Sequence, residues 1–232
     1  QVKGGIVVKL KKMEIENYRQ FQDAVINFDD ELTVLAGANN SGKTSIIELF
    51  RRVFKDKNFS KEDVAAEFYS KLQDDFLNLI DKIYEESWDE TEFRENVKKA
   101  FSTQKEDKWT AIRIKIEVTY NKDESISLFS DYLMELSDSC TSFFFLYNYE
   151  INTFELNKIL GLKAASLFQK KINIGDLEKR RKTKANIAKI NEAKEEYKRF
   201  LEEIFEEALE NRVYFTDKEY MNRGQISINE FQ

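Results

Sequence analysis

The feature that most constrains this chain is a loop that matches the pattern G-x-x-x-x-G-K-[ST]: Gly37-Ala38-Asn39-Asn40-Ser41-Gly42-Lys43-Thr44. Glycine at two loop positions lets the backbone approach a phosphate group, and main-chain N–H groups can then point at the anion. The ammonium of Lys43 can contact the β- and γ-phosphate oxygens, and the hydroxyl of Thr44 is a suitable oxygen ligand for Mg²⁺. A glycine turn that only joins two elements would need neither residue.

The patterns on either side of the loop fit this interpretation. The short apolar run 32–36 precedes the loop, and we expect a strand that is buried on both faces there. Apolar residues at spacings of three and four follow over 46–54, which predicts a helix whose N-terminus faces the anion. We therefore predict that residues 37–45, up to Ser45 in the first helical turn, bind ATP, and that Thr44 holds Mg²⁺.

The composition excludes several other chemistries. The chain has 232 residues and no histidine, which removes Ser-His-Asp catalysis, histidine metal sites and histidine general bases. Its single cysteine, Cys140, cannot form an internal disulfide, which favours a reducing, cytoplasmic location. No apolar run approaches the length of about 18 residues that a membrane span needs. The net charge of −6 excludes a globally basic nucleic-acid binder but leaves room for a local basic patch.

Hydrophobic periodicity predicts a mixture of strands and helices. Residues 110–120 alternate cleanly between apolar and polar, which is typical of a half-buried antiparallel strand. Further strands are expected over 6–10, 13–15, 24–28, 142–149, 213–215 and 225–228. Helices are expected in 60–104 (two, with caps at Ser60 and Asp89), 125–135 and 177–210.

Two segments resemble a known group of proteins. Residues 13–21, MEIENYRQF, and 32–45, LTVLAGANNSGKTS, resemble the ABC-type ATPase heads of the RecF, structural-maintenance-of-chromosomes (SMC) and OLD (overcoming lysogenization defect) group. The asparagine-rich loop and the antiparallel strands favour the OLD-like ATPases, which are common in bacterial phage defence. The resemblance is close over residues 10–55 and looser to residue 150.

This resemblance implies a fold and a division of the chain. We expect an α/β P-loop NTPase half-head with an antiparallel β-lobe and a helical arm. Residues 1–150 would form the N-terminal lobe, 151–212 the arm, and 213–232 strands that return to the head. A second head would sandwich ATP, and the role would be in DNA processing, repair or antiviral defence.

The resemblance also carries over to single residues. Arg19 matches an arginine that lies near the nucleotide in the family, so it is a candidate phosphate or ribose contact; the alternative is a surface arginine at a strand end. Asn40 matches a loop position near the γ-phosphate, or it only shapes the loop. The later Asp-Glu strand and the L-S-G-G signature of family heads are not found in this sequence. Gln225 is only a guess for the family's mid-head glutamine.

The catalytic base is therefore unknown, and three functions stay open. The first is an ATPase head that binds ATP with Mg²⁺ but hydrolyses it poorly as this chain alone. The second is a non-hydrolysing nucleotide-binding module that presents its arm to a nuclease or effector. The third, a P-loop kinase, is disfavoured because an antiparallel lobe and an arm occupy the place of an arginine-bearing lid.

Two further patterns point to nucleic acid. The densest basic run is Lys179, Arg180, Arg181, Lys182 and Lys184, which could contact DNA phosphates or could simply be a solvated helix face. The aromatic run 143–145 could stack on bases, but aromatic strands belong to the core more often.

Overall fold

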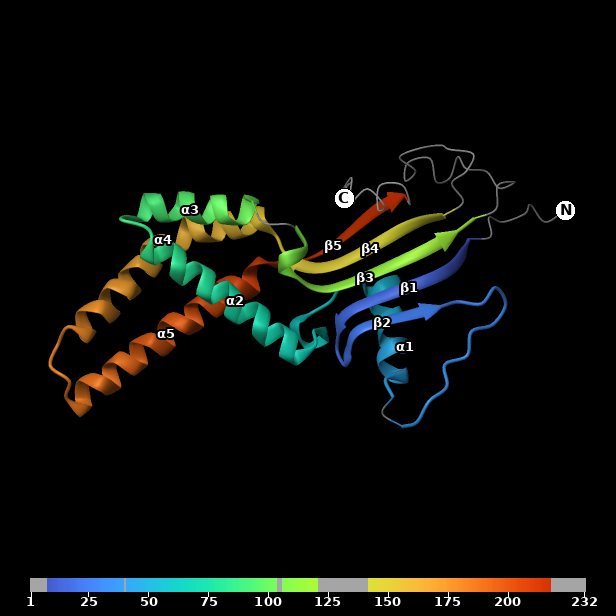
Figure 1. The fold of residues 1–232 in the computed structure, drawn as a ribbon, viewed down its shortest axis with the longest axis horizontal. Helices are drawn as coiled ribbons and strands as arrows, with labels where there is room; N and C mark the ends of the chain where they lie inside the picture. Colours follow the sequence, from blue (N-terminus) through green and yellow to red (C-terminus); the bar gives the residue numbers. More distant parts are fainter. Residues whose placement is uncertain (1–7, 40, 104–105, 121–141, 218–232) are drawn as a thin grey trace. The chain divides into compact units, whose positions relative to one another are not determined.

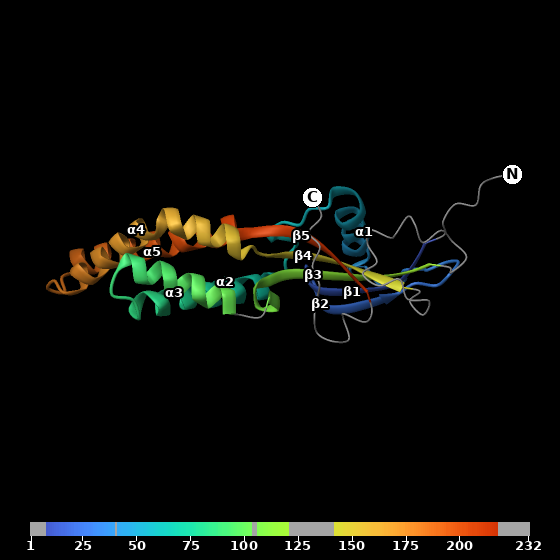
Figure 2. The same ribbon diagram turned by 90° about the horizontal axis from the view of Figure 1, so that it is seen from above.

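The computed structural model describes residues 8–39, 41–103, 106–120 and 142–217, and the chain divides into two compact units. One unit, Gln1–Phe68 with Ala111–Glu150 and Asn211–Gln232, contains the loop of residues 37–44 and the sheet. The other, Tyr69–Thr110 with Ile151–Glu210, is helical. Residues 69–110 thus group with the helical segment, although the sequence analysis counted them with the N-terminal lobe. Figures 1 and 2 show the elements of each unit.

The sheet has five strands in the order β2-β1-β3-β4-β5. Their bounds are β1 Lys9–Tyr18, β2 Phe21–Asn27, β3 Thr110–Thr119, β4 Ser142–Ile151 and β5 Leu209–Asp217. β1 lies antiparallel to both β2 and β3, so that Ile15 stands opposite Ala24 on one side and Ile114 on the other. The predicted antiparallel β-lobe is confirmed for these three strands (Figure 1).

The alternation of side chains explains which face of the sheet is buried. Met13 and Ile15 of β1 and Ile114 of β3 are fully buried. Between them, Glu14 and Lys115 stay partly exposed and form an ion pair of 3.4 Å across the strands. Phe143 and Phe144 of β4 are also buried, so the aromatic run contributes to the core and is not an exposed stacking platform.

The prediction of a buried strand over 32–36 is wrong for this structure. These residues form no strand, and the side chains of Leu32 and Val34 are each 72% exposed. The local hydrogen bonds are those of a turn, in which the Asp29 carboxylate accepts from Glu31 N–H. A strand forms only where a neighbour offers hydrogen-bonding groups, and no described strand lies beside this segment.

Helix α1, Lys43–Arg51, begins directly at the loop and continues as a π-helical turn, Arg52–Asp56. This confirms the predicted helix, which starts three residues earlier than the apolar pattern over 46–54. Ile46 and Leu49 face the core, whereas Ile47 is 64% exposed.

The helical unit is built from α2 Ala66–Glu85, α3 Glu90–Thr103, α4 Thr153–Glu178 and α5 Lys184–Ala208. Short 3-10 turns lie at Lys61–Asp63 and Glu106–Trp109. The predicted cap at Asp89 is confirmed, because its carboxylate accepts from Glu92 N–H at 2.9 Å. Ser60 forms the predicted capping box with Asp63, but it caps the 3-10 turn Lys61–Asp63 and not α2, which begins at Ala66.

The single helix predicted over 177–210 is wrong, because α4 ends at Glu178 and α5 begins at Lys184. Thr183 caps α5 by accepting from Asn186 N–H, which favours a helix start at this point. α4 and α5 lie side by side in both views (Figures 1 and 2). Of the apolar side chains of α5, Tyr197 and Leu201 are buried, but Ile187 is 46% exposed.

Among the described residues, no helix combines the length and the apolar character needed to cross a membrane. The predicted helix 125–135, the strand 225–228 and the residues Asn40, Cys140 and Gln225 lie outside the described residues.

Candidate phosphate-binding site

The ammonium of Lys43 lies inside its own loop. Lys43 Nζ donates hydrogen bonds to the carbonyl oxygens of Gly37 (2.6 Å) and Ala38 (2.7 Å), and a longer one to Ser41 Oγ (3.3 Å). The loop backbone also closes on itself, because Ser41 N–H donates to Ala38 O at 3.3 Å. The structure therefore brings together residues from the start, middle and end of the predicted motif, with a positive charge between them.

Among the described residues, no side chain caps the N-terminus of α1. Gly42 is the N-cap residue, with φ of 90°. The first turn contains no acidic residue. The N–H groups of a first helical turn have no partner within the helix, and the helix dipole places partial positive charge there. This helix end is therefore suited to an anion.

The turn between β1 and β2 packs against the loop at Gly42. A Cβ atom on Gly42 would lie 2.5 Å from both Gln20 Nε2 and Phe21 Cζ, so only glycine fits here without displacing these side chains. The Ser45 hydroxyl donates to Gln20 Oε1 at 3.0 Å. No local pattern indicates this role of Gln20 and Phe21, because both lie far from the motif in sequence.

Thr44 and Asn39 are exposed, and Thr44 Oγ1 has no hydrogen-bond partner in the part of the chain that the structure describes. A free hydroxyl next to a lysine and a helix N-terminus fits the predicted role as a Mg²⁺ ligand beside a phosphate. Within the described ranges, no group of three or more Asp, Glu or Cys side chains could hold a metal ion.

Arg19 makes a contact that the sequence analysis missed. Its Nη2 and Nε atoms donate to Asp63 Oδ1 at 2.9 and 3.3 Å. Asp63 is 1% exposed and also lies 3.2 Å from Arg52 Nε through its other oxygen. The capping box at Ser60 located the turn that contains Asp63, but no local pattern connects two residues that are 44 positions apart.

Tyr18 lies beside this cluster and is fully buried. Its hydroxyl has no hydrogen-bond partner among the described residues. Burial raises the pKa of Tyr18 to about 12, so this hydroxyl stays neutral at physiological pH and adds no negative charge near the two arginines.

The predicted basic run lies in the helical unit, at the turn between α4 and α5. All five of its basic side chains are exposed. Lys179 pairs with Asp176 at 3.4 Å, whereas Arg180, Arg181, Lys182 and Lys184 have no ion-pair partner among the described residues. The run is thus the exposed, positively charged end of the hairpin formed by α4 and α5, and most of its charges are not neutralised by other described residues.

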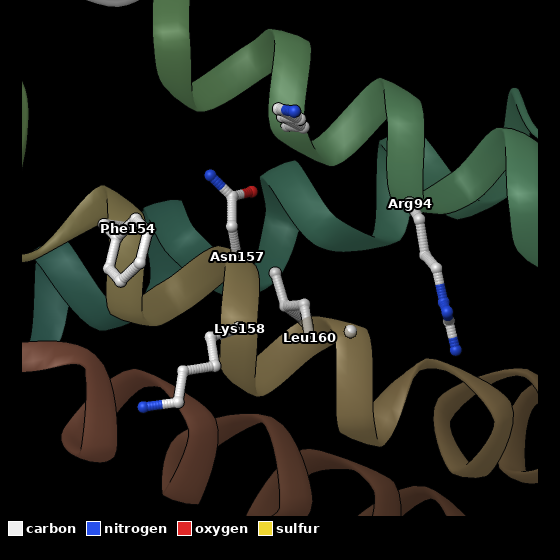
Figure 3. A pocket seen from close by; sticks show the side chains of 7 residues that line it. Arg94, Phe154, Asn157, Lys158 and Leu160 are labelled. Atoms are coloured by element: carbon white, nitrogen blue, oxygen red, sulfur yellow. The ribbon is translucent and has the colours of Figure 1, made fainter.

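A shallow pocket between α3 and α4 contains none of the predicted site residues (Figure 3). It is lined by Arg94, Lys98, Phe154, Asn157, Lys158, Leu160 and Gly161. Arg94 pairs with Glu90, and Lys158 pairs with Glu155. Because two of the three cations are neutralised, the pocket is a weaker anion site than the loop.

Comparison with known proteins gives an independent result. The sequence pattern of the AAA ATPase domain family matches residues 9–230. The DNA double-strand break repair Rad50 ATPases of Methanosarcina mazei and Methanosarcina acetivorans are each 40% identical over 65 residues, which is 28% of this chain and 6% of theirs. An uncharacterized protein of Methanocaldococcus jannaschii is 30% identical over 118 residues, which is 49% of this chain and 36% of that protein. No solved structure is significantly similar.

Proposed function

The chain belongs to the AAA ATPase domain family, and on that basis we propose that it is the nucleotide-binding part of an ATPase head that binds ATP with Mg²⁺. The observation that carries the proposal is the position of the Lys43 ammonium, held by Gly37 O and Ala38 O inside the loop. An ammonium at an uncapped helix N-terminus is a preorganised site for a phosphate chain. Lys43 and the main-chain N–H groups would bind the phosphates, and the Thr44 hydroxyl would hold Mg²⁺.

Catalysis by the isolated chain is expected to be weak. Hydrolysis requires a group that activates water, and this sequence contains no recognisable Asp-Glu strand or signature motif. The exposed apolar run that contains Leu32 and Val34 also favours the presence of a further segment in the working protein. An exposed apolar run of this kind is normally covered by another part of the protein or by a partner. We propose that a further segment, on this or another chain, supplies the carboxylate that acts as the catalytic base.

The biological process is proposed from the relatives. The Rad50 similarity favours a role in DNA repair or processing, with a second head that shares the nucleotide. The asparagine-rich loop favours the OLD subgroup and a role in antiviral defence, with a nuclease or effector as partner. The relatives are much longer than the matched segments, so these activities, and a cytoplasmic location, are part of the proposal.

Calorimetry with ATP and MgCl₂ tests the nucleotide site. Wild-type protein is expected to bind ATP, and Lys43→Ala to weaken binding about 100-fold, since charge-assisted hydrogen bonds contribute about 1.5–3 kcal/mol each. Thr44→Ala should remove most of the Mg²⁺ dependence. Lys98→Ala is the matched control and should bind as wild type does, because Lys98 lies in the helical unit and has no ion-pair partner among the described residues. Equal affinity of wild type and Lys43→Ala would refute the proposed site.

A further inference from the structure

The carboxylate of Asp63 connects two segments of the nucleotide-binding unit. Its Oδ1 atom accepts from Arg19, in the turn between β1 and β2, and its Oδ2 atom lies 3.2 Å from Arg52, in the π-helical extension of α1. With 1% exposure, Asp63 is almost completely shielded from water. A buried carboxylate between two guanidinium groups is strongly fixed in position, because the loss of either partner would leave a buried charge unpaired.

The backbone around Arg19 is strained and is held by the same segment. Arg19 and Asn17 have φ values of 50° and 59°, in the left-handed region that non-glycine residues seldom adopt. Arg19 N–H donates to Asp63 O, and Ala65 N–H donates to Asn17 O, both at 2.8 Å. Strained backbone persists only where the surrounding contacts determine it, and it is concentrated at functional sites.

This turn is also the one that lies against the phosphate loop. Gln20 follows Arg19 directly. Its amide oxygen accepts a hydrogen bond from the Ser45 hydroxyl, and its amide nitrogen packs against Gly42. A chain of direct contacts therefore runs from Asp63 through the turn to the start of α1.

Asp63 is shared between two cations. One carboxylate faces two guanidinium groups, so Asp63 alone does not neutralise both. The Arg19 side chain is 30% exposed, and its Nη1 group makes none of the bonds to Asp63. Arg19 therefore has a donor edge available for an additional anion.

We propose that Asp63 is a positioning residue of the nucleotide site, which holds Arg19 so that its free edge binds a phosphate of the nucleotide in the loop. This inference rests on the proposed function. Asp63 itself touches no nucleotide; it fixes the side chain and the backbone of the residue that does.

A double-mutant cycle on the full chain tests this role. ATP affinity with Mg²⁺ is measured by calorimetry for wild type, Arg19→Gln, Asp63→Asn and the double variant, well below the melting temperature of each. Each single substitution is expected to weaken ATP binding about 10-fold or more, because each removes or misdirects one charge-assisted contact. The double variant should bind no more weakly than Arg19→Gln alone.

Asp81→Asn is the matched control. Asp81 is also in an ion pair, with Lys171 at 2.7 Å, but it lies in the helical unit, so the loss of its charge should lower stability and leave ATP affinity unchanged. If Asp63→Asn does not fold, Ser60→Ala replaces it. Ser60 Oγ lies 3.5 Å from Asp63 Oδ2, and its removal loosens the carboxylate without removing its charge. Ser60→Ala should weaken ATP binding about threefold in the wild-type background and not at all in Arg19→Gln.

The outcomes separate the two proposals. ATP binding that depends on Lys43 but is unchanged in Asp63→Asn overturns the role of Asp63 only. Effects of Arg19→Gln and Asp63→Asn that simply add would also overturn it, since independent sites are additive. Stronger ATP binding by Asp63→Asn would overturn it too, because Asp63 would then hold Arg19 away from the nucleotide. No ATP binding by wild type overturns both proposals.

Discussion

Gly42 and Phe21 approach so closely that a Cβ atom on Gly42 would lie 2.5 Å from Phe21 Cζ. Two segments that a sequence pattern treats separately, the hairpin turn and the loop of residues 37–44, are therefore packed against each other at one glycine. The φ of 90° at Gly42 adds a second requirement for glycine.

Gly42→Ala is expected to destabilise the protein by about 2 kcal/mol or more, because alanine at this φ is strained and its methyl group must displace Phe21. ATP binding should be lost as well, since the loop shifts. Urea unfolding and calorimetry measure the two effects. Gly161→Ala is the control: Gly161 lies in α4 with no atom near a Cβ position, so the substitution should stabilise by about 0.5–1 kcal/mol. Equal effects at both glycines would contradict the packing described.

Alanine substitutions at Leu32 and Leu49 test the finding that residues 32–36 are exposed and form no buried strand. Leu49 of α1 is fully buried, so Leu49→Ala should lower the free energy of unfolding by about 2–4 kcal/mol. Leu32 is 72% exposed, so Leu32→Ala should change it by less than about 0.5 kcal/mol. Chemical denaturation of the two variants measures the difference. A large loss in Leu32→Ala would mean that residues 32–36 are packed in solution.

Tyr197→Phe tests a partly buried hydrogen bond in the helical unit. Tyr197 OH donates to Asp81 Oδ1 at 2.7 Å, and Asp81 keeps its ion pair with Lys171 when the hydroxyl is removed. The substitution should therefore cost about 1.5 kcal/mol, as expected for a hydrogen bond to a charged group.

The pH dependence of this loss has a defined sign. Burial, and then the hydrogen bond to Asp81, raise the pKa of Tyr197 above its ordinary value of 10.0. The unfolded chain thus releases this proton first, so the stabilisation is complete below about pH 10 and decreases as the pH rises further. The stability difference between wild type and Tyr197→Phe should be constant near neutral pH and shrink above pH 10. A difference that grows there would contradict the assignment.

The basic tip between α4 and α5 predicts salt-dependent DNA binding. If Arg180, Arg181 and Lys182 contact phosphates, changing all three to Gln should weaken binding of a duplex of random sequence. The slope of log K against log salt should fall by about 2–3, because each phosphate contact contributes about 0.9. Fluorescence anisotropy across a salt series measures both quantities. An unchanged slope would mean that the tip is only a solvated turn.

The sequence determined the parts of this protein that depend on local pattern. The eight-residue motif located the loop, the spacing of apolar residues located α1, and the alternation over 110–120 gave an antiparallel strand with its buried face. Ser60 and Asp89 were correct as caps, because capping is a contact between residues three positions apart.

Only the tertiary structure decided the remainder, because it depends on partners that are distant in sequence. The run 32–36 has the composition of a buried strand, yet whether it forms one depends on a neighbour that hydrogen-bonds to it. The pairing of Arg19 with Asp63 and the contact of Gly42 with Phe21 join residues more than 20 positions apart. Such contacts are set by how the chain packs in three dimensions, and local periodicity carries no information about them.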